Sequence, residues 1–570
     1  MPRGIAVQYL CGVFLVLVAS LTLWLNPPRT LAQPAKKETA PPVPPEALLR
    51  SDTWKGVPST PLQPGEIDRL MEKELQANKL KASPVTNDDQ FLRRVRLDLT
   101  GQVPSAEEVE LFLTNKDPSK RAKLIKRLID SDEYARHWAR YWRHVVSAVE
   151  APFGNAHEPA FEDWLFRQFQ DNKNWGEIVR AKLTAEGSLK KGDKDANGAI
   201  YFLGRHNGAD GDIDRAAETS RIFLGIQIQC AQCHNDRRTK IWKQVQFHEL
   251  AGFFSRMAVG GSTNEFIKVS AKKGGEHRMP VRDSKQGIIT YPRFLDGKSP
   301  EANADDQARR KAIADFLTAE DNYWFSAAYV NRMWTEVVGQ GFYERMDDLS
   351  PKSDVVYPAV LTRLAAAFRG SHYDTKALVR AIANSQTYQR QVRLGEALNQ
   401  HLKFAAVYPA RLRGEVLWKD LDCVLGRMPE NPLLRKAFLG EFDFDPSLKS
   451  DEVQGSIAQA LWLLNNPLVN DRIKVQDLRV PVPNKGGKGF TPGNAEPTNL
   501  KKLLAKYQGD DSGALRALYQ HTMSRRPTDR ELKMCLQFIQ DTRKEMGTRN
   551  EAFEDIFRGL INTAEFQRRR

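Results

Sequence analysis

Apolar residues recur at intervals of three and four along most of the chain after residue 66, and this pattern most restricts the possible folds. One such stripe, within residues 120–129, consists of Ala122, Ile125, Leu128 and Ile129. Spacing of this kind is typical of an amphipathic helix with one buried face. The predicted fold class is therefore mainly α, with many helices in the folded body.

Length and breaks in the helical pattern divide the chain into parts. Because a domain averages roughly 150 residues, a chain of 570 residues exceeds one ordinary core. The predicted parts are a signal peptide or membrane anchor, a proline-rich linker, a cytochrome-c-like helical domain, a small β-hairpin and loop insertion, and a C-terminal helical domain. Their predicted boundaries are 1–32, 33–65, 66–258, 259–300 and 301–570. Within them, residues 186–212 are expected as a long loop, a helix is expected to run from Ile213 straight into Cys230, and the stretch 480–499, rich in proline and glycine, is expected as an irregular break.

The first 37 residues differ in composition from the rest. Arg3 precedes an apolar run from Leu10 to Leu25, and small residues suited to cleavage follow at 30–32. This order is typical of an export signal. The apolar run also approaches the roughly 20 residues that span a bilayer, so a retained anchor is the alternative. In either case the body is predicted to be exported to the periplasm or cell envelope, with membrane contact only through an uncleaved N-terminal segment.

The formal net charge of +14 bears on the choice of partners. Most basic residues are interleaved with acids in helical segments, which predicts a solvated surface. An acidic polysaccharide is a candidate partner of such a surface, whereas no nucleic acid is expected for an exported chain. No phosphate-binding glycine loop, nucleophile elbow or helical H-E-x-x-H motif is present, so the sequence does not favour hydrolase chemistry.

Residues 230–234 read CAQCH, the attachment motif of c-type haem. In that chemistry Cys230 and Cys233 form thioethers with the porphyrin, and His234 is the proximal iron ligand. With five cysteines and ten histidines in the chain, random placement would give the motif about once per thousand such chains. The other cysteines are too few for a disulfide scaffold, so the pair is interpreted as a local chemical site.

The same three residues fit other chemistry as well. A redox disulfide would cycle between Cys230 and Cys233, with His234 lowering a thiol pKa. A zinc site would use all three residues and a fourth ligand such as His248 or His206. A purely structural disulfide is the remaining alternative, and the motif alone leaves all of these open.

A haem at His234 would take a second axial ligand from the opposite face. The candidates are Met279, Met257, His248 and His206. Met279 ranks first because it stands among polar residues beside Pro280, an unusual setting for a core methionine. Met257 closes the apolar face of a helix expected over 242–257, where a core role is expected.

A second candidate metal site precedes the motif. Asp193, Asp195 and Asn197, followed by Gly198, match the first half of a calcium-binding loop. The acid that closes such a loop is missing, because Gly204 occupies its position. The acids that could replace it are Asp210, Asp212 and Asp214.

Long blocks of the sequence resemble a known domain pair. FLRRVRLDLTGQVPSAEEVELFL and CAQCHNDRRTKIWKQVQFHELAGFFSRM resemble the planctomycete-type cytochrome-c-like domain of unknown function (PSCyt, second type). NYWFSAAYVNRMWTEVVGQGFYERMDDLSP, YPARLRGEVLWKDL and the blocks from SRRPTDREL to LINTAEF resemble its usual partner domain of unknown function (PSD type). The motif usually continues C-H-D-H-P in that family, whereas this chain has Asn235-Asp236-Arg237.

The resemblance implies an exported c-type-cytochrome-like protein with haem c at Cys230, Cys233 and His234. It would transfer electrons, or support a redox step, with a redox partner that the sequence does not identify. The altered continuation favours haem over a Cys/His zinc site. The alternative is a non-haem structural or binding protein, associated with polysaccharide, whose motif is a disulfide or metal staple. Arg332, in the second domain, is expected to pair with Asp347 or Asp348.

Overall fold

The computed structural model describes residues 56–147, 154–193, 196–237, 240–262, 265–282, 284–350, 353–393, 403–429, 431–448, 452–483 and 490–569. The predicted signal peptide, most of the predicted linker and Asp195 of the predicted calcium loop lie outside these residues. Within the described ranges, no helix is both long enough and apolar enough to cross a membrane. The four cysteines in these ranges are free thiols.

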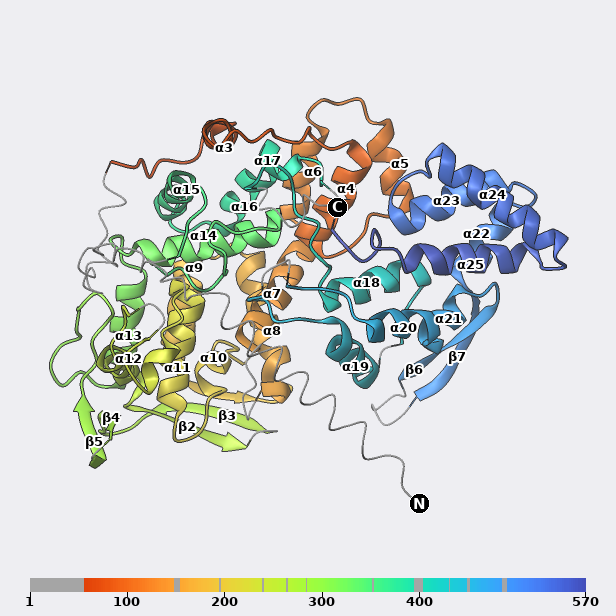
Figure 1. Ribbon diagram of the computed structural model, residues 1–570. Helices are drawn as coiled ribbons and strands as arrows, with labels where there is room; N and C mark the ends of the chain where they lie inside the picture. The colour runs from red at the N-terminus through yellow and green to blue at the C-terminus, as the bar shows by residue number, and fades with distance from the viewer. Residues whose placement is uncertain are drawn as a thin grey trace, which may run out of the picture. The chain divides into compact units, whose positions relative to one another are not determined.

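The N-terminal part is built from helices (Figure 1). Their bounds are α3 (Glu66–Ala77), α4 (Asp88–Thr100), α5 (Ala106–Thr114), α6 (Lys120–Ile129), α7 (Asp132–Ser147), α8 (Gly154–Gln170) and α9 (Trp175–Leu183). Ser105 caps α5, because its Oγ accepts a hydrogen bond from the backbone N–H of Glu108 at 3.1 Å. Of the apolar stripe within 120–129, Ile125, Leu128 and Ile129 are buried in α6, whereas Ala122 is exposed.

Short helices and small sheets follow. The helices are α10 (Ile200–Gly204), α11 (Gly211–Thr219) with a π-helical turn (Ser220–Leu224), a 3-10 turn (Gln229–Gln232) and α12 (Gln244–Ala251) with a 3-10 turn (Gly252–Phe254). The strands are β1 (Gly187–Lys190), β2 (Met257–Ser262), β3 (Phe266–Ala271), β4 (His277–Val281) and β5 (Ser284–Thr290). They form an antiparallel sheet in the order β1-β3-β2 and the hairpin β4-β5, so the predicted β insertion is present.

Three local predictions need correction here. The segment 186–212, expected as a loop, contains β1 and α10. The helix expected to run straight into Cys230 ends at Gly225, which adopts a left-handed φ of +64°. The helix expected over 242–257 ends earlier, and Met257 pairs with Ala271 in the sheet.

The C-terminal part is also helical, which confirms the mainly α fold class. Its helices are α13 (Asp306–Leu317), α14 (Tyr323–Val338), α15 (Pro358–Gly370), α16 (Thr375–Asn384), α17 (Gln386–Gln389), α18 (Gly414–Leu425), α19 (Pro432–Phe442), α20 (Ile457–Asn465), α21 (Pro467–Ile473), α22 (Asn499–Lys506), α23 (Asp511–Met523), α24 (Asp529–Lys544) and α25 (Arg549–Ile561). An antiparallel hairpin, β6 (Asp477–Pro483) and β7 (Phe490–Pro497), occupies the stretch expected as an irregular break over 480–499 (Figure 1).

Two hydrophobic cores support these elements. The larger core draws on residues from Ile67 to Ala405 and therefore from both sides of residue 300. At its centre Trp142 packs against Trp175, with ring centroids 4.2 Å apart. The smaller core is formed mainly by helices after residue 412.

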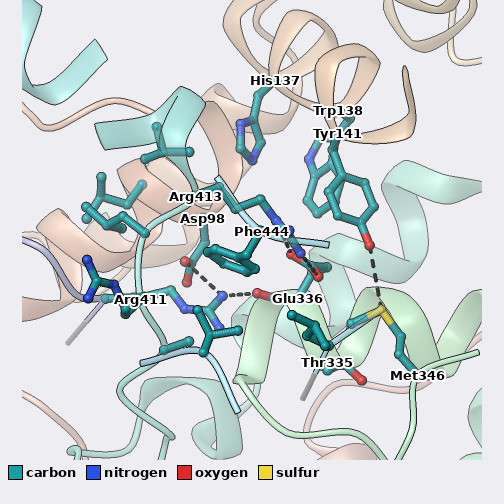
Figure 2. Close-up of a pocket in the computed structure, with 17 residues that line it drawn as sticks. Asp98, His137, Trp138, Tyr141, Thr335, Glu336, Met346, Arg411, Arg413 and Phe444 are labelled. Atoms are coloured by element: carbon teal, nitrogen blue, oxygen red, sulfur yellow. Dashed lines mark hydrogen bonds and ion pairs between the residues drawn. The ribbon is translucent and has the colours of Figure 1, made fainter. Parts of the chain in front are cut away.

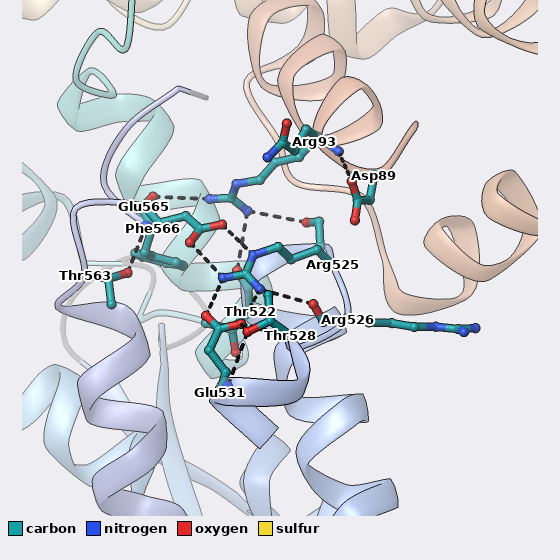
Figure 3. Close-up of polar contacts among 12 residues, drawn as sticks. Asp89, Arg93, Thr522, Arg525, Arg526, Thr528, Glu531, Thr563, Glu565 and Phe566 are labelled. Atoms are coloured by element: carbon teal, nitrogen blue, oxygen red, sulfur yellow. Dashed lines mark hydrogen bonds and ion pairs between the residues drawn. The ribbon is translucent and has the colours of Figure 1, made fainter. Parts of the chain in front are cut away.

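Blocks that carry the family resemblance meet in one polar network, shown in Figure 3. Arg525 donates two hydrogen bonds to Glu531, at 2.7 and 2.8 Å, and two to Glu565, at 2.7 and 2.9 Å. These bonds lower the pKa of Glu531 to about 2. Arg93 of α4 donates to the carbonyl O of Phe566 at 3.2 Å. The network holds the end of the chain against α4.

Candidate functional site

The CAQCH motif lies on a short exposed turn. A Cβ on Gly225 would lie 2.5 Å from Cδ1 of Leu349, so glycine is needed both for the left-handed backbone and for close packing. Beyond this residue the chain enters the 3-10 turn Gln229–Gln232. Cys230 and Cys233 are both exposed and both free. Their sulfur atoms are therefore accessible to a bound group or to oxidants.

His234 is also exposed, and its ring has a defined orientation. Its Nδ1 lies 2.8 Å from the backbone carbonyl O of Asn235. With Nδ1–H donating to this carbonyl, the lone pair of Nε2 points away from the bond. Histidines that ligate metals commonly donate their second ring N–H to a carbonyl in this way. The donor set of two thiols and one oriented imidazole therefore fits haem c.

A buried hydrogen-bonded chain supports the motif turn from inside. Nε2 of His248, on α12, lies 2.9 Å from the carbonyl O of Gln232. Nδ1 of His248 lies 2.7 Å from Nε2 of His277, and Nδ1 of His277 lies 2.7 Å from Oδ2 of Asp212. The hydrogen bonds therefore run from the carboxylate of Asp212 through His277 and His248 to the backbone of the motif turn.

The carboxylate of Asp212 ends this series of hydrogen bonds, and its pKa depends on its neighbours. Burial raises the pKa of Asp212, but the contact with His277, the backbone N–H of Ile213 and the charge of Arg215 together outweigh burial and bring that pKa below its usual range. Both ring nitrogens of His248 are engaged. His248 therefore positions the CAQCH turn, and neither of its ring nitrogens points to an open site.

The other axial candidates differ in their surroundings. His206 is buried within an acidic cluster, with ring nitrogens 3.0 Å from Glu218 and 3.4 Å from Asp214. Burial lowers the pKa of His206, and hydrogen bonds with these two acids raise it above its usual value. Met257 is buried in the larger core. None of these contacts brings His206 or Met257 to the motif turn.

Met279 stands on β4, and this strand is joined to the motif turn. The side-chain amide of Gln244 donates to the carbonyl O of Gln232 at 3.2 Å and to that of Pro280 at 3.4 Å. Met279 itself is half-buried and precedes Pro280. The first-ranked axial candidate therefore belongs to a strand that shares a hydrogen-bonding partner with the motif turn.

The predicted calcium loop is only partly described. Asp193 is exposed, and Oδ1 of Asn197 accepts a hydrogen bond from the backbone N–H of Ala199 at 3.1 Å, at the start of α10. Two of the acids that could complete the loop, Asp212 and Asp214, face histidines instead. Within the described part of the chain, no three His, Cys, Asp or Glu side chains are grouped to hold a metal ion. The calcium and zinc sites remain predictions.

Arg332 and Asp347 were expected to pair with each other, but in the structure each forms its direct contacts with other residues. Asp347 lies 3.3 Å from Arg221 and accepts a hydrogen bond from Gln227 at 2.9 Å. Arg332 donates to the hydroxyl of Tyr141 at 3.4 Å. Burial raises the pKa of Asp347, whereas the charges of Arg332 and Arg221 lower it, and the lowering prevails.

A cleft of about 640 Å³ lies mostly in the second domain, with one wall from α3 of the first, and contains none of the motif residues. Its walls come from the end of α14, the start of α15, the segment 403–408 and part of α3. Gly339 and Gly341 line it because larger residues would not fit: a Cβ on Gly339 would lie 2.8 Å from the carbonyl O of Tyr408. No motif in the sequence indicates this cleft.

A smaller cavity of about 70 Å³ shares Thr335, Met346 and Leu448 with the cleft. Figure 2 shows its paired charges and the bond from the hydroxyl of Tyr141 toward Met346. Arg413 bonds to Glu336 at 2.5 Å. Burial lowers the pKa of His137 to about 3, so this ring is neutral near pH 7.

Comparison with known families identifies two regions of the chain. Residues 66–259 match the model PSCyt2, described as a protein of unknown function (DUF1549), and residues 309–432 match PSD1, a protein of unknown function (DUF1553). The chain carries the PSCyt2–PSD1 domain pair. In this pair the motif turn and His248 belong to PSCyt2, whereas most of the cleft belongs to PSD1. No match was found among the curated proteins or the solved structures.

Proposed function

We propose that the PSCyt2 domain binds haem c through Cys230, Cys233 and His234, and that the protein transfers electrons at the cell envelope. The observation that supports this most directly is that Cys230 and Cys233 are exposed free thiols beside His234, whose ring is oriented through its Nδ1. Haem c, when bound, supplies one-electron transfer at its iron. The electrons would pass to or from a redox partner outside the cytoplasm.

Other residues of the chain hold the turn in place. His248 and Gln244 both approach the carbonyl O of Gln232 from α12, so the backbone between the two cysteines is fixed at its centre. Met279 would be the further residue that holds the haem iron. The contacts of His248 and His206 engage their rings, and Met257 is part of the larger core.

The test is to produce the full chain in a host that matures c-type cytochromes, and to record its intact mass and absorbance spectrum. We expect one covalent haem and a Soret band. Cys233→Ala should abolish the doubly linked product, whereas Cys423→Ala changes an exposed cysteine on α18 and should leave mass and spectrum unchanged. Met279→Ala should keep the covalent mass and shift the spectrum.

A colourless protein of unmodified mass would refute the proposal. A product lighter by two hydrogens that regains them on reduction would identify a disulfide between Cys230 and Cys233 instead. A shift in spectrum with His248→Ala but none with Met279→Ala would keep haem binding and overturn the assignment of the second axial ligand.

A further inference from the structure

We infer that the PSD1 cleft is a binding site for a neutral saccharide, a ligand class that presents hydroxyl groups around an apolar ring face. The cleft volume of about 640 Å³ lies within the range of roughly 300–1,000 Å³ of small-molecule sites. The inference rests on the lining of the cleft and is independent of haem binding.

Aromatic side chains form much of the wall. They are Tyr343, Tyr357, Phe404 and Tyr408. Tyr357 and Phe404 are in contact, with ring centroids 5.8 Å apart. Rings of this kind offer a flat apolar surface together with a polar edge, which suits the C–H face and the hydroxyls of a sugar ring.

Tyr357 provides the most specific evidence. Its side chain is 4% exposed, and its hydroxyl has no hydrogen-bond partner among the described residues. Burial raises the pKa of Tyr357 to about 12, so the hydroxyl stays protonated and can donate. A buried hydroxyl without a partner lowers stability. A ligand hydroxyl in the cleft would supply the missing partner.

The backbone at this wall is strained as well. Tyr357, Lys403 and Phe404 adopt left-handed φ values of +52°, +43° and +65°. Residues with side chains rarely take this conformation, and where they do it often accompanies a functional site. In this cleft it fixes the position of two aromatic rings and one ammonium group along the same wall.

Polar groups of the lining include both acceptors and donors. The carboxylates are those of Glu74, Glu344 and Asp354, and the amides are those of Asn78 and Gln340. Lys403 donates to Oδ1 of Asn78 at 3.3 Å. The start of α15, which lacks a side-chain cap, adds the partial positive charge of a helix amino end near Tyr357, although Pro358 itself has no N–H to donate.

This mixture favours a neutral ligand over a charged one. An acidic saccharide would face three carboxylates, whereas a cation would face Lys403 and the amino end of α15. Hydroxyl groups both donate and accept, so they satisfy the two kinds of partner without a charge penalty. A neutral saccharide is therefore the class that the lining accommodates best.

The site is held in shape before any ligand binds. Oδ1 of Asn331, on α14, accepts from the backbone N–H groups of Phe342 and Tyr343 at 2.8 and 3.2 Å. Tyr343 also forms a β-bridge with Val355. Rigid walls reduce the ordering cost of binding, so measurable affinity does not require the cleft to reorganise.

The experiment is isothermal titration calorimetry of the full chain with cellohexaose, mannohexaose, xylohexaose and chitohexaose, each up to millimolar concentration. Hexagalacturonate and spermidine serve as the acidic and the cationic probe. We expect at least one neutral hexaose to bind, with affinity reduced about tenfold or more by Tyr357→Phe and by Glu74→Gln, the loss typical of a removed buried hydrogen bond.

Matched controls lie outside the cleft. Tyr291→Phe removes the hydroxyl of an exposed tyrosine, and Glu72→Gln changes an exposed acid on the same helix, α3, as Glu74. Both should bind the hexaose like the wild type. Absence of binding by all four neutral hexaoses, binding of a charged probe alone, or wild-type affinity in both cleft variants would overturn the inference.

Thermal melting of the unliganded proteins gives a second readout. Because the hydroxyl of Tyr357 has no partner among the described residues, Tyr357→Phe should melt at the same temperature as the wild type or slightly above it. A loss of several degrees would show that the hydroxyl is bonded within the folded chain, which would overturn its assignment as a ligand-binding group.

Discussion

Lys182 is a basic residue placed where its charge destabilises the fold. It lies on α9 and is completely buried, and its Nζ has no hydrogen-bond partner among the described residues. Aromatic rings surround this nitrogen at 5.0–5.8 Å from their centroids; they belong to Trp142, Phe161, Trp175 and Phe223. Burial lowers the pKa of Lys182 from 10.5 to about 7.

The expected effect of Lys182→Met follows from this pKa. A folded-state pKa about 3.5 below the unfolded value corresponds to roughly 5 kcal/mol at 1.36 kcal/mol per unit, and attraction of the ammonium to the ring faces, which raises the folded-state pKa, reduces this penalty by about 2 kcal/mol. The remaining penalty of about 3 kcal/mol acts in full below pH 7, where the folded chain must bury the charged form. It decreases as pH rises toward 10.5, because the unfolded chain then binds more protons than the folded one.

Urea denaturation of wild type and Lys182→Met at pH 6, 8 and 10 measures this effect. The variant should be more stable by about 3 kcal/mol at pH 6, and the gain should fall to about 1 kcal/mol at pH 10, where most unfolded chains still carry the lysine proton. Lys123→Met changes an exposed lysine on α6 and should have an effect within about 0.5 kcal/mol at each pH. A loss of stability at pH 6, or a gain that does not vary with pH, would refute the reasoning.

Other substitutions test the framework around the two sites. Arg525→Met should lower the free energy of unfolding by about 2–4 kcal/mol, because it leaves two carboxylates without their cation. Arg526→Met changes the exposed neighbour and should lower it by under about 0.5 kcal/mol. Equal losses for the two variants in urea denaturation would contradict this. The loss of stability caused by Arg525→Met should shrink as pH falls from 4.5 toward 2, because protonation of Glu531 over this range removes its ion pair with Arg525 in the wild type as well. An unchanged loss at pH 2 would argue against the Arg525–Glu531 pair. Gly341→Ala should lower the free energy of unfolding by about 2–3 kcal/mol, because its Cβ would lie 2.6 Å from a threonine oxygen. In Gly208→Ala the new Cβ meets nothing within 4 Å, so this variant should melt like the wild type. Equal melting temperatures for the two variants would show that the cleft loop is loosely packed.

Helix starts and apolar stripes were predictable because they depend on neighbouring residues. Ser105 and the stripe within 120–129 act within one or two turns of their own helices. Helix ends were less predictable where distant backbone intervenes. A Cβ on Gly252 would lie 3.0 Å from the backbone N of Pro292, and the chain after this glycine pairs with β3 instead of continuing the helix.

The hairpin β6–β7 was missed for a related reason. Prolines and glycines over 480–499 predict an irregular segment, because proline cannot donate to a β ladder. In the structure Pro481 pairs with Pro492, and the register shifts between Arg479 and Pro481. A two-stranded ribbon accepts such residues because each of its strands has a free edge, and this tolerance is not visible in a local sequence pattern.

The two candidate sites also differ in how far the sequence predicted them. The motif residues are contiguous, so CAQCH could be recognised directly. The cleft is assembled from segments near residues 74–78, 335–358, 403–408 and 448. Its most specific group, the hydroxyl of Tyr357, is distinguished only by the lack of a hydrogen-bond partner among the described residues, a property that exists only once the chain has folded.

The polar residues upstream and downstream of the motif show why spacing alone left too many candidate ligands. Asp212 and Asp214 were candidates for calcium, and His206 and His248 were candidates for iron. In the structure Asp214 and Glu218 face His206, while Asp212 holds His277, which in turn holds His248. Acidic and basic candidates satisfy one another inside the domain, since a buried charge requires a partner. Because these side chains are paired with one another, the residues still available to bind a haem are those on the exposed turn. Met279 is then the candidate for the second iron ligand that remains to be tested.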